Sequence, residues 1–203
     1  MRPRRSTQDR QQELTDAALH LIATRGIAAL STRSLAEVVG LSSGAIFRHF
    51  RSLDDLLLSV VGRVEQVLAA TYPPPDLPAN ERLALLIRAR SRAVGQQLGI
   101  LRLVLSEQFL LSLPEGCSAR LLACVQETRR YVESCLEEAQ AAGTVRRDLP
   151  PQVLAPIVMG TIQMLALAPA GASFPEPDAI EVGLLNLLSP PSPAPERGRK
   201  KRT

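Results

Sequence analysis

The chain has 203 residues, of which 45% are hydrophobic but only 3% aromatic, and this composition favours packed helices because sheets are enriched in aromatic and β-branched residues. No apolar run reaches the roughly 18 residues of a membrane span, which argues against a membrane protein. The basic start precedes a polar segment instead of the apolar stretch of a signal peptide, so we expect a cytoplasmic location. The net charge of the chain is +4, and residues 1–51 and the last fourteen residues each carry a net charge of +4, so the segment between them is acidic. Basic ends around an acidic middle indicate a polyanionic partner.

The amino-terminal quarter predicts a series of helices with short connections. A first helix over 7–26 carries one apolar stripe, and a second over 31–40 ends at Gly40 after about two turns. A third helix over 44–50 follows a serine cap, and a fourth over 52–72 begins with an acidic pair that suits a helix start. Because the apolar residues of each helix share a face, we expect these helices to pack on a common core.

A proline-rich segment at 73–78 separates this series from a longer and more apolar set of helices. The later helices are predicted over 79–97, 98–112, 115–142, 150–168 and 177–189. No segment has a strand pattern, so the predicted fold class is all-α, with about nine helices.

The helices fall into an amino-terminal group and a longer, more apolar group, which predicts two domains. We place the first domain at 1–53, the second at 54–189, and a disordered basic tail at 190–203. The tail either adds non-specific phosphate affinity or only keeps the protein in solution.

The residues that commonly carry catalysis or bind metals are scattered. Cys117, Cys124 and Cys135 form no CxxC pair and have no histidine partner, so we expect neither a metal site nor a cofactor. The sequence also lacks paired carboxylates near a histidine and a glycine-rich phosphate loop. We therefore expect that the chain is not an enzyme.

The spacing of three small or apolar residues predicts a helix-turn-helix motif. Counting from Thr32 as position one, Ala36 falls at five, Gly40 at nine and Ile46 at fifteen. A small residue at Ala36 lets the two helices approach closely, and Gly40 permits the positive φ of a tight turn. Ile46 then fills the angle between the helices from the second one.

The second helix of this motif has the composition of a surface that reads double-stranded DNA. Ser42, Ser43 and Gly44 are small, so the start of the helix can come close to bases and phosphates. Once Ile46 and Phe50 turn inward, the residues left for the outer face are Phe47, Arg48 and His49, with Arg33 on the preceding helix directed to the same groove. The alternative is an ordinary surface turn with an incidental arginine and histidine.

The segment STRSLAEVVGLSSGAIFRHFRSLDDLL, residues 31–57, together with the preceding helix, resembles the TetR family of transcriptional regulators. The resemblance implies a three-helix helix-turn-helix DNA-binding domain followed by a larger helical domain for effector binding and dimerisation. It also implies a homodimer that represses a promoter from a palindromic operator until a small-molecule effector releases it. The residues that it implies in DNA contacts are Arg33, Ser42, Ser43, Gly44, Phe47, Arg48 and His49. The family usually has Tyr where this chain has Phe47 and Lys where it has Leu53, and Arg48 and Arg51 are candidates to replace the lost phosphate contacts.

The helix predicted over 150–168 is too apolar for the surface of a monomer. It is either a central core helix or part of a dimer interface, and the apolar side of the helix over 177–189 favours the interface. The interface candidates are Val153, Ile157, Gly160, Met164, Ile180, Leu184, Leu187 and Leu188.

An effector pocket has weaker support in the sequence. The candidates are Arg88, Arg92, Glu107, Gln108, Phe109, Gln163 and Met164, which place polar or soft groups among apolar helices. For each of the polar residues, a salt-bridged or solvated helix face is the competing interpretation. The alternative function is a DNA-binding protein of the same fold whose larger domain recruits a protein partner instead of a metabolite.

Overall fold

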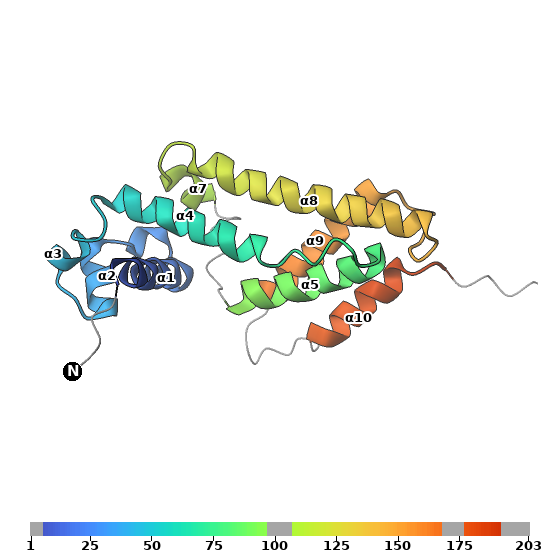
Figure 1. The fold of residues 1–203 in the computed structure, drawn as a ribbon, viewed down its shortest axis with the longest axis horizontal. Coiled ribbons are helices and arrows are strands. Elements are labelled where there is room, and N and C mark those ends of the chain that lie inside the picture. The colour runs from blue at the N-terminus through green and yellow to red at the C-terminus, as the bar shows by residue number, and fades with distance from the viewer. Residues whose placement is uncertain (1–5, 97–106, 168–176, 192–203) are drawn as a thin grey trace, which may run out of the picture.

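The computed structural model describes residues 6–96, 107–167 and 177–191, and within these ranges the regular structure is entirely helical. The α-helices are α1 (Thr7–Arg25), α2 (Thr32–Val39), α3 (Ser43–Ile46), α4 (Leu53–Ala69), α5 (Ala79–Gln96), α7 (Glu107–Ser112), α8 (Cys117–Ala141), α9 (Pro151–Leu167) and α10 (Pro177–Leu188), and the short 3₁₀ helix η1 (Ile27–Ala29) follows α1. Figure 1 shows an elongated molecule with α1, α2 and α3 at one end and α5, α9 and α10 at the other. This arrangement confirms the predicted all-α fold class.

Serine caps define the starts of the amino-terminal helices. The hydroxyl of Ser6 accepts a hydrogen bond from the backbone N–H of Asp9, and the Asp9 carboxylate accepts one from the N–H of Ser6. The hydroxyl of Ser52 caps α4 in the same way by accepting from the N–H of Asp55, whose charge also suits the positive end of the helix dipole. Each cap satisfies donors that an uncapped helix would leave without partners.

The third helix is shorter than the sequence predicts. The helix expected over 44–50 ends as α3 at Ile46, and the chain then continues in tight turns. In these turns the N–H of Arg48 donates to the carbonyl of Ala45 and that of His49 donates to the carbonyl of Ile46. Such bonds between residues three apart wind the chain more tightly than an α-helix does.

Two apolar clusters of buried residues form the interior. The first joins α1, α2, α3 and α4 and also takes in Cys117 and Leu121 at the start of α8. The second joins α5, α8, α9 and α10 around Leu86, Val132 and Val158. Helix α4 packs against α1, α5 and α8, and helix α8 contributes buried residues to both clusters.

The predicted domain boundary after residue 53 falls in the first turn of α4. The core that α1, α2 and α3 share continues along α4 through Val60 and Val61 to Val64. The predicted boundary therefore separates the start of α4 from residues that complete the amino-terminal core.

None of the helices in the described ranges combines the length and apolar composition needed to cross a bilayer. The predicted basic tail lies, from residue 192 onward, outside the described residues.

Candidate nucleic-acid interface

The amino-terminal motif has the interior that its spacing predicts. Gly40 ends α2 in the left-handed conformation, with φ 67° and ψ 38°, and no neighbouring heavy atom lies within 4 Å of the position that a Cβ would occupy there. The residue is thus required for its backbone conformation rather than for close packing. Ile46 and Phe50 are both buried, together with Leu35 and Ala36 of α2. This packing fixes α3 and the turn after it against α2.

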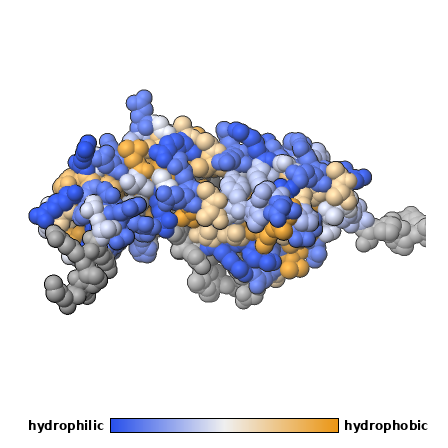
Figure 2. Space-filling model, viewed as in Figure 1, coloured by the Kyte–Doolittle hydropathy of each residue, from blue (hydrophilic) through white to orange (hydrophobic). Residues whose placement is uncertain are grey.

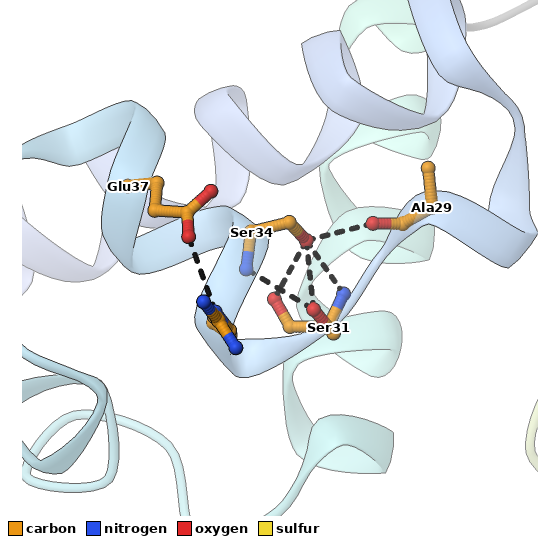
Figure 3. A network of polar contacts seen from close by, with 5 residues as sticks. Ala29, Ser31, Ser34 and Glu37 are labelled. Atoms are coloured by element: carbon orange, nitrogen blue, oxygen red, sulfur yellow. Dashed lines mark hydrogen bonds and ion pairs between the residues drawn. The ribbon is translucent and has the colours of Figure 1, made fainter.

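Hydrogen bonds fix the start of α2, as Figure 3 shows. The hydroxyl of Ser31 accepts from the N–H of Ser34 at 3.1 Å, and the hydroxyl oxygen of Ser34 lies 3.0 Å from the N–H of Ser31 and 2.7 Å from the carbonyl oxygen of Ala29. This network anchors the first turn, from which Arg33 projects with 87% of its side chain exposed. Its Nε lies 3.3 Å from Glu37 Oε1, and such an exposed pair costs little to exchange for another anion.

The surface formed by α3 and the following turn has small residues at its start and larger ones at its end. Ser42 caps α3 by accepting from the N–H of Ala45 at 3.3 Å, and Ser43 and Gly44 are exposed. Because α3 has only four residues, its summed dipole is small, so side chains rather than the helix end must provide most of the affinity for an anion. Phe47 is 53% exposed.

Two arginines complete this surface, whereas the histidine is partly turned inward. Arg48 and Arg51 are both exposed, and the backbone N–H of Arg51 donates to Asp55 Oδ2 at 3.2 Å. His49 is half-buried, with its Nδ1 atom enclosed and without a hydrogen-bond partner in the described part of the chain. Its backbone carbonyl accepts from Gln11 Nε2 at 2.9 Å, which ties the turn to α1. We define the recognition face as Arg33, Ser43, Gly44, Phe47, Arg48 and Arg51.

The predicted dimer residues divide into two groups. An exposed set, which we call the apolar stripe, comprises Val153, Ile157, Gly160 and Met164 on α9 and Leu187 on α10. These α9 residues follow one another by three or four positions and so share a face, and Figure 2 shows hydrophobic residues on the surface over α10. Ile180 is half-buried.

Two of the predicted interface residues need correction. Leu184 and Leu188 are only 4% and 3% exposed, and both pack in the second apolar cluster of their own chain. Both lie on an apolar side of α10, and that side packs against α5 and α9. Buried in this way, neither side chain is available to a second subunit.

The predicted effector residues whose side chains are described do not line the groove between α4 and α8. Arg88 forms an ion pair with Glu181 of α10 at 2.6 Å, Arg92 and Met164 are exposed, and Gln163 is half-buried. The salt-bridged interpretation therefore applies to Arg88. The side chains of Glu107, Gln108 and Phe109 lie outside the described residues, although their backbone belongs to α7.

Arg90 of α5 is a buried cation that is not among the predicted site residues. The signal was present, because Leu83, Leu86, Ile87 and Arg90 follow one another at the spacing of a single helix face. Within the described ranges no group of three potential metal-ligating side chains is positioned to hold a metal ion.

Comparison with known proteins places the amino-terminal part of the chain in a family. Residues 14–60 match the family model described as bacterial regulatory proteins, tetR family. A nucleoid occlusion factor SlmA from Haemophilus ducreyi is 32% identical over 88 residues, which is 43% of each chain. The repressor KstR2 from Mycolicibacterium smegmatis is 28% identical over 69% of each chain, and the repressor AcnR from Corynebacterium jeikeium is 28% identical over 72% of this chain and 74% of its own. The SlmA match thus spans less than half of that relative's length.

Solved structures share the fold along most of the chain. The structure of AibR in complex with isovaleryl coenzyme A and operator DNA is similar with a TM-score of 0.73 at 19% identity, covering 90% of this chain and all of that one. The ketosteroid transcriptional regulator KstR2 of Mycobacterium tuberculosis gives a TM-score of 0.75 at 20% identity, covering 89% of this chain and 95% of that one. At this identity the likeness establishes the arrangement of helices.

Proposed function

Because the chain belongs to the TetR family of bacterial regulatory proteins, we propose that it is a dimeric repressor that binds a palindromic DNA operator and leaves it when a small molecule binds. One observation carries the DNA-binding part of this proposal. The recognition face exposes three arginines and an aromatic ring on a short motif whose interior residues are buried and whose helix starts are capped.

The recognition face suits the chemistry of a DNA groove. Arg48 and Arg33 can donate to phosphate oxygens or to the O6 and N7 acceptors of guanine, and Arg51 can donate to the backbone beside them. The exposed ring of Phe47 can contact a thymine methyl or a sugar, in place of the phosphate contact that a tyrosine hydroxyl provides. Ser43 and Gly44 permit a close approach of the backbone.

The apolar stripe supports a dimer. Ile157 is 48% exposed and Leu187 is 65% exposed, and the intervening Gly160 leaves open space above α9 in which another helix can lie. An isologous pairing through this stripe would place two recognition faces on one side of the DNA. Half-sites would then lie roughly 34 Å apart or at a multiple of that distance, so the operator would be palindromic.

Helix α4 supports the release step. It completes the core of the amino-terminal motif and also packs against α5 and α8, so a ligand that moves these helices changes the position of the motif. The AibR structure contains both isovaleryl coenzyme A and operator DNA, and it shares this fold. We infer that this chain likewise binds a small molecule as well as DNA.

The competing function is a DNA-bound protein whose larger region recruits a protein partner. The similarity to nucleoid occlusion factors favours it, since that name does not describe a metabolite sensor. That similarity covers a smaller share of the chain than the similarity to the repressors KstR2 and AcnR does. We therefore favour the repressor.

Selection of bound fragments from random DNA tests the proposal. We expect the enriched fragments to contain one inverted repeat, bound by one or more dimers. The logarithm of the binding constant should fall linearly with the logarithm of the salt concentration, with a slope of about −0.9 for each phosphate that the protein neutralises. Fragments without a common sequence, or a common sequence without two-fold symmetry, would contradict a dimeric operator-binding protein.

A further inference from the structure

Arg90 lies inside the carboxyl-terminal region rather than on its surface. It is only 4% exposed and follows Leu86 and Ile87 on the inner face of α5. The neighbouring arginine Arg82 is also buried, but it has the carboxylate of Glu138 as a partner. Arg90 has no carboxylate within 4 Å in the described part of the chain.

The protein satisfies the guanidinium of Arg90 only in part. Its Nη2 donates to Thr128 Oγ1 at 3.0 Å, and its central carbon lies 5.2 Å from the centre of the Tyr72 ring. The Nε and Nη1 atoms are enclosed and have no hydrogen-bond partner within the described residues. The cation therefore retains N–H groups that are removed from water without an acceptor.

Such an arrangement is costly for a residue whose role is only to fill the core. Desolvation penalises a buried charge strongly unless an anion and hydrogen bonds compensate for it. Here burial lowers the pKa of the Arg90 guanidinium below its ordinary value, although nearby Tyr72 acts in the opposite direction. An apolar side chain of similar length would pack in the same place without this penalty.

A surface groove lies beside this part of the interior, although Arg90 itself does not line it. The groove has a volume of about 370 Å³, lies between α4 and α8, and is lined in part by Leu68, Ala69, Tyr72, Ala123 and Cys124. This volume lies within the range of roughly 300–1,000 Å³ that small-molecule sites occupy. Tyr72 belongs both to the groove and to the immediate surroundings of the guanidinium, so the groove and the cation share a wall.

The charged residues of the groove favour a ligand with a single negative charge. Arg120 is paired with Glu65 at 2.6 Å, so its charge is already balanced. Glu127 also lines the groove, and its carboxylate is not within ion-pair distance of Arg90. A dianionic group would find one unpaired guanidinium and a repelling carboxylate.

We propose that Arg90 binds the carboxylate of a small monoanionic effector whose aliphatic body lies in the groove between α4 and α8. The carboxylate supplies oxygen acceptors that the guanidinium N–H groups lack, and charge-assisted bonds of this kind are among the stronger hydrogen bonds in proteins. The side chain of Tyr72 turns aside to admit the ligand. The proposal rests on the proposed function in one respect, because it names the class of effector that the repressor senses.

Thermal unfolding with a matched pair of probes tests the carboxylate directly. Octanoate and octan-1-ol have the same chain length, and only the first has a charge. At ten times its Kd, octanoate should raise the Tm of the wild-type protein by about 3–6 °C, and octan-1-ol at equal concentration should raise it less. Equal effects of the two probes, or no effect of octanoate or of its shorter and longer homologues, would overturn the proposal.

Variants separate ligand binding from packing. Arg90→Met should abolish the shift caused by octanoate while leaving the ligand-free Tm unchanged or higher, whereas Arg130→Met, on the exposed side of α8, should behave like the wild type. Glu127→Gln should strengthen octanoate binding, because it removes the repelling charge. An octanoate shift that survives in Arg90→Met, or that weakens in Glu127→Gln, would exclude this binding mode.

A spectroscopic measurement covers the case in which Arg90→Met does not fold. In wild-type protein labelled with ¹⁵N-arginine, the Nε–H resonance of Arg90, identified by its absence from Arg90→Lys, should shift with octanoate and remain in place with octan-1-ol. A resonance unmoved by saturating octanoate would contradict a contact at this group.

These measurements contain no DNA, so their outcome is independent of operator binding. If octanoate binds through Arg90 without loosening a selected operator, the site stands and its regulatory role is rejected. If an operator is selected but no carboxylate binds, the repressor stands and the effector class is wrong.

Discussion

The two ends of the molecule place charge in opposite ways. In the amino-terminal motif the arginines are outside and the interior is formed by aliphatic residues and Phe50. In the carboxyl-terminal region a cation, Arg90, is inside, while aliphatic side chains such as Ile157 and Leu187 are outside. Figure 2 shows this contrast as a largely hydrophilic surface at the end that holds α2 and α3 and hydrophobic residues on the surface over α10.

The contrast indicates three kinds of partner. Exposed arginines can exchange water for the phosphates of DNA at little cost, so they suit a large polyanion. A buried cation that has no acidic partner among the described residues suits an anion small enough to enter, such as a monoanionic metabolite. Exposed aliphatic residues in one stripe suit a second copy of the same surface.

The largest expected effect comes from placing a charge in the apolar stripe. In a two-fold interface, Ile157→Glu would bury two unpaired carboxylates, at a cost of about 3 kcal/mol or more. We expect the dimer to dissociate at micromolar concentration and the affinity for a palindromic site to fall by at least about a hundredfold. Light scattering coupled to size-exclusion chromatography and fluorescence anisotropy measure the two quantities.

Leu122→Glu is the matched control for that variant. Leu122 is 49% exposed, nearly the same as Ile157, but it lies on α8 outside the apolar stripe. The control variant should remain dimeric and bind DNA normally. A dimeric Ile157→Glu protein would show that subunits associate through another surface.

The second-largest loss of operator affinity is expected from a substitution in the recognition face. Arg48→Ala should weaken operator binding by about 1–3 kcal/mol, or roughly 5- to 150-fold, without changing dimerisation. If Arg48 contacts guanine, the loss is confined to sequences with that base, and if it contacts phosphate, all sequences lose affinity and the salt slope falls by about one. Unchanged anisotropy titrations on both specific and random DNA would remove Arg48 from the interface.

The smallest changes in stability and DNA affinity are expected from alanine substitutions at two glycines of the motif, Gly40 and Gly44. A Cβ at either position would lie in open space. Gly40→Ala should destabilise the protein by about 1–2 kcal/mol, because an alanine adopts the left-handed conformation at a cost. Gly44→Ala, inside helix α3, should stabilise it by about 0.5–1 kcal/mol while weakening DNA binding through the added methyl group. Denaturant titration and anisotropy give the two readings, and normal DNA affinity in Gly44→Ala would contradict the placement of this face against DNA.

The local features of the motif could be predicted from the order of its residues. The positions of Ala36, Gly40 and Ile46, and the serines that precede the helices, act through steric limits and hydrogen bonds between residues close in the chain. The helix-turn-helix could therefore be predicted together with its buried side. The length of α3 could not, because the choice between an α-helix and tighter turns after Ile46 depends on how Phe50 packs against the other helices.

Which side of each later helix faces the interior depends on how the helices pack against one another. In α10 both sides are apolar, and packing on α5 and α9 buries Leu184 and Leu188 while leaving Leu187 outside. The spacing of Arg90 indicates only that it shares a face of α5 with Leu86 and Ile87, whereas the absence of a nearby carboxylate in the described structure follows from which helices surround it. Contacts between residues far apart in the chain determine which side chains are buried and which charges are paired. A single sequence shows the periodicity of each helix but does not show which helix packs against it.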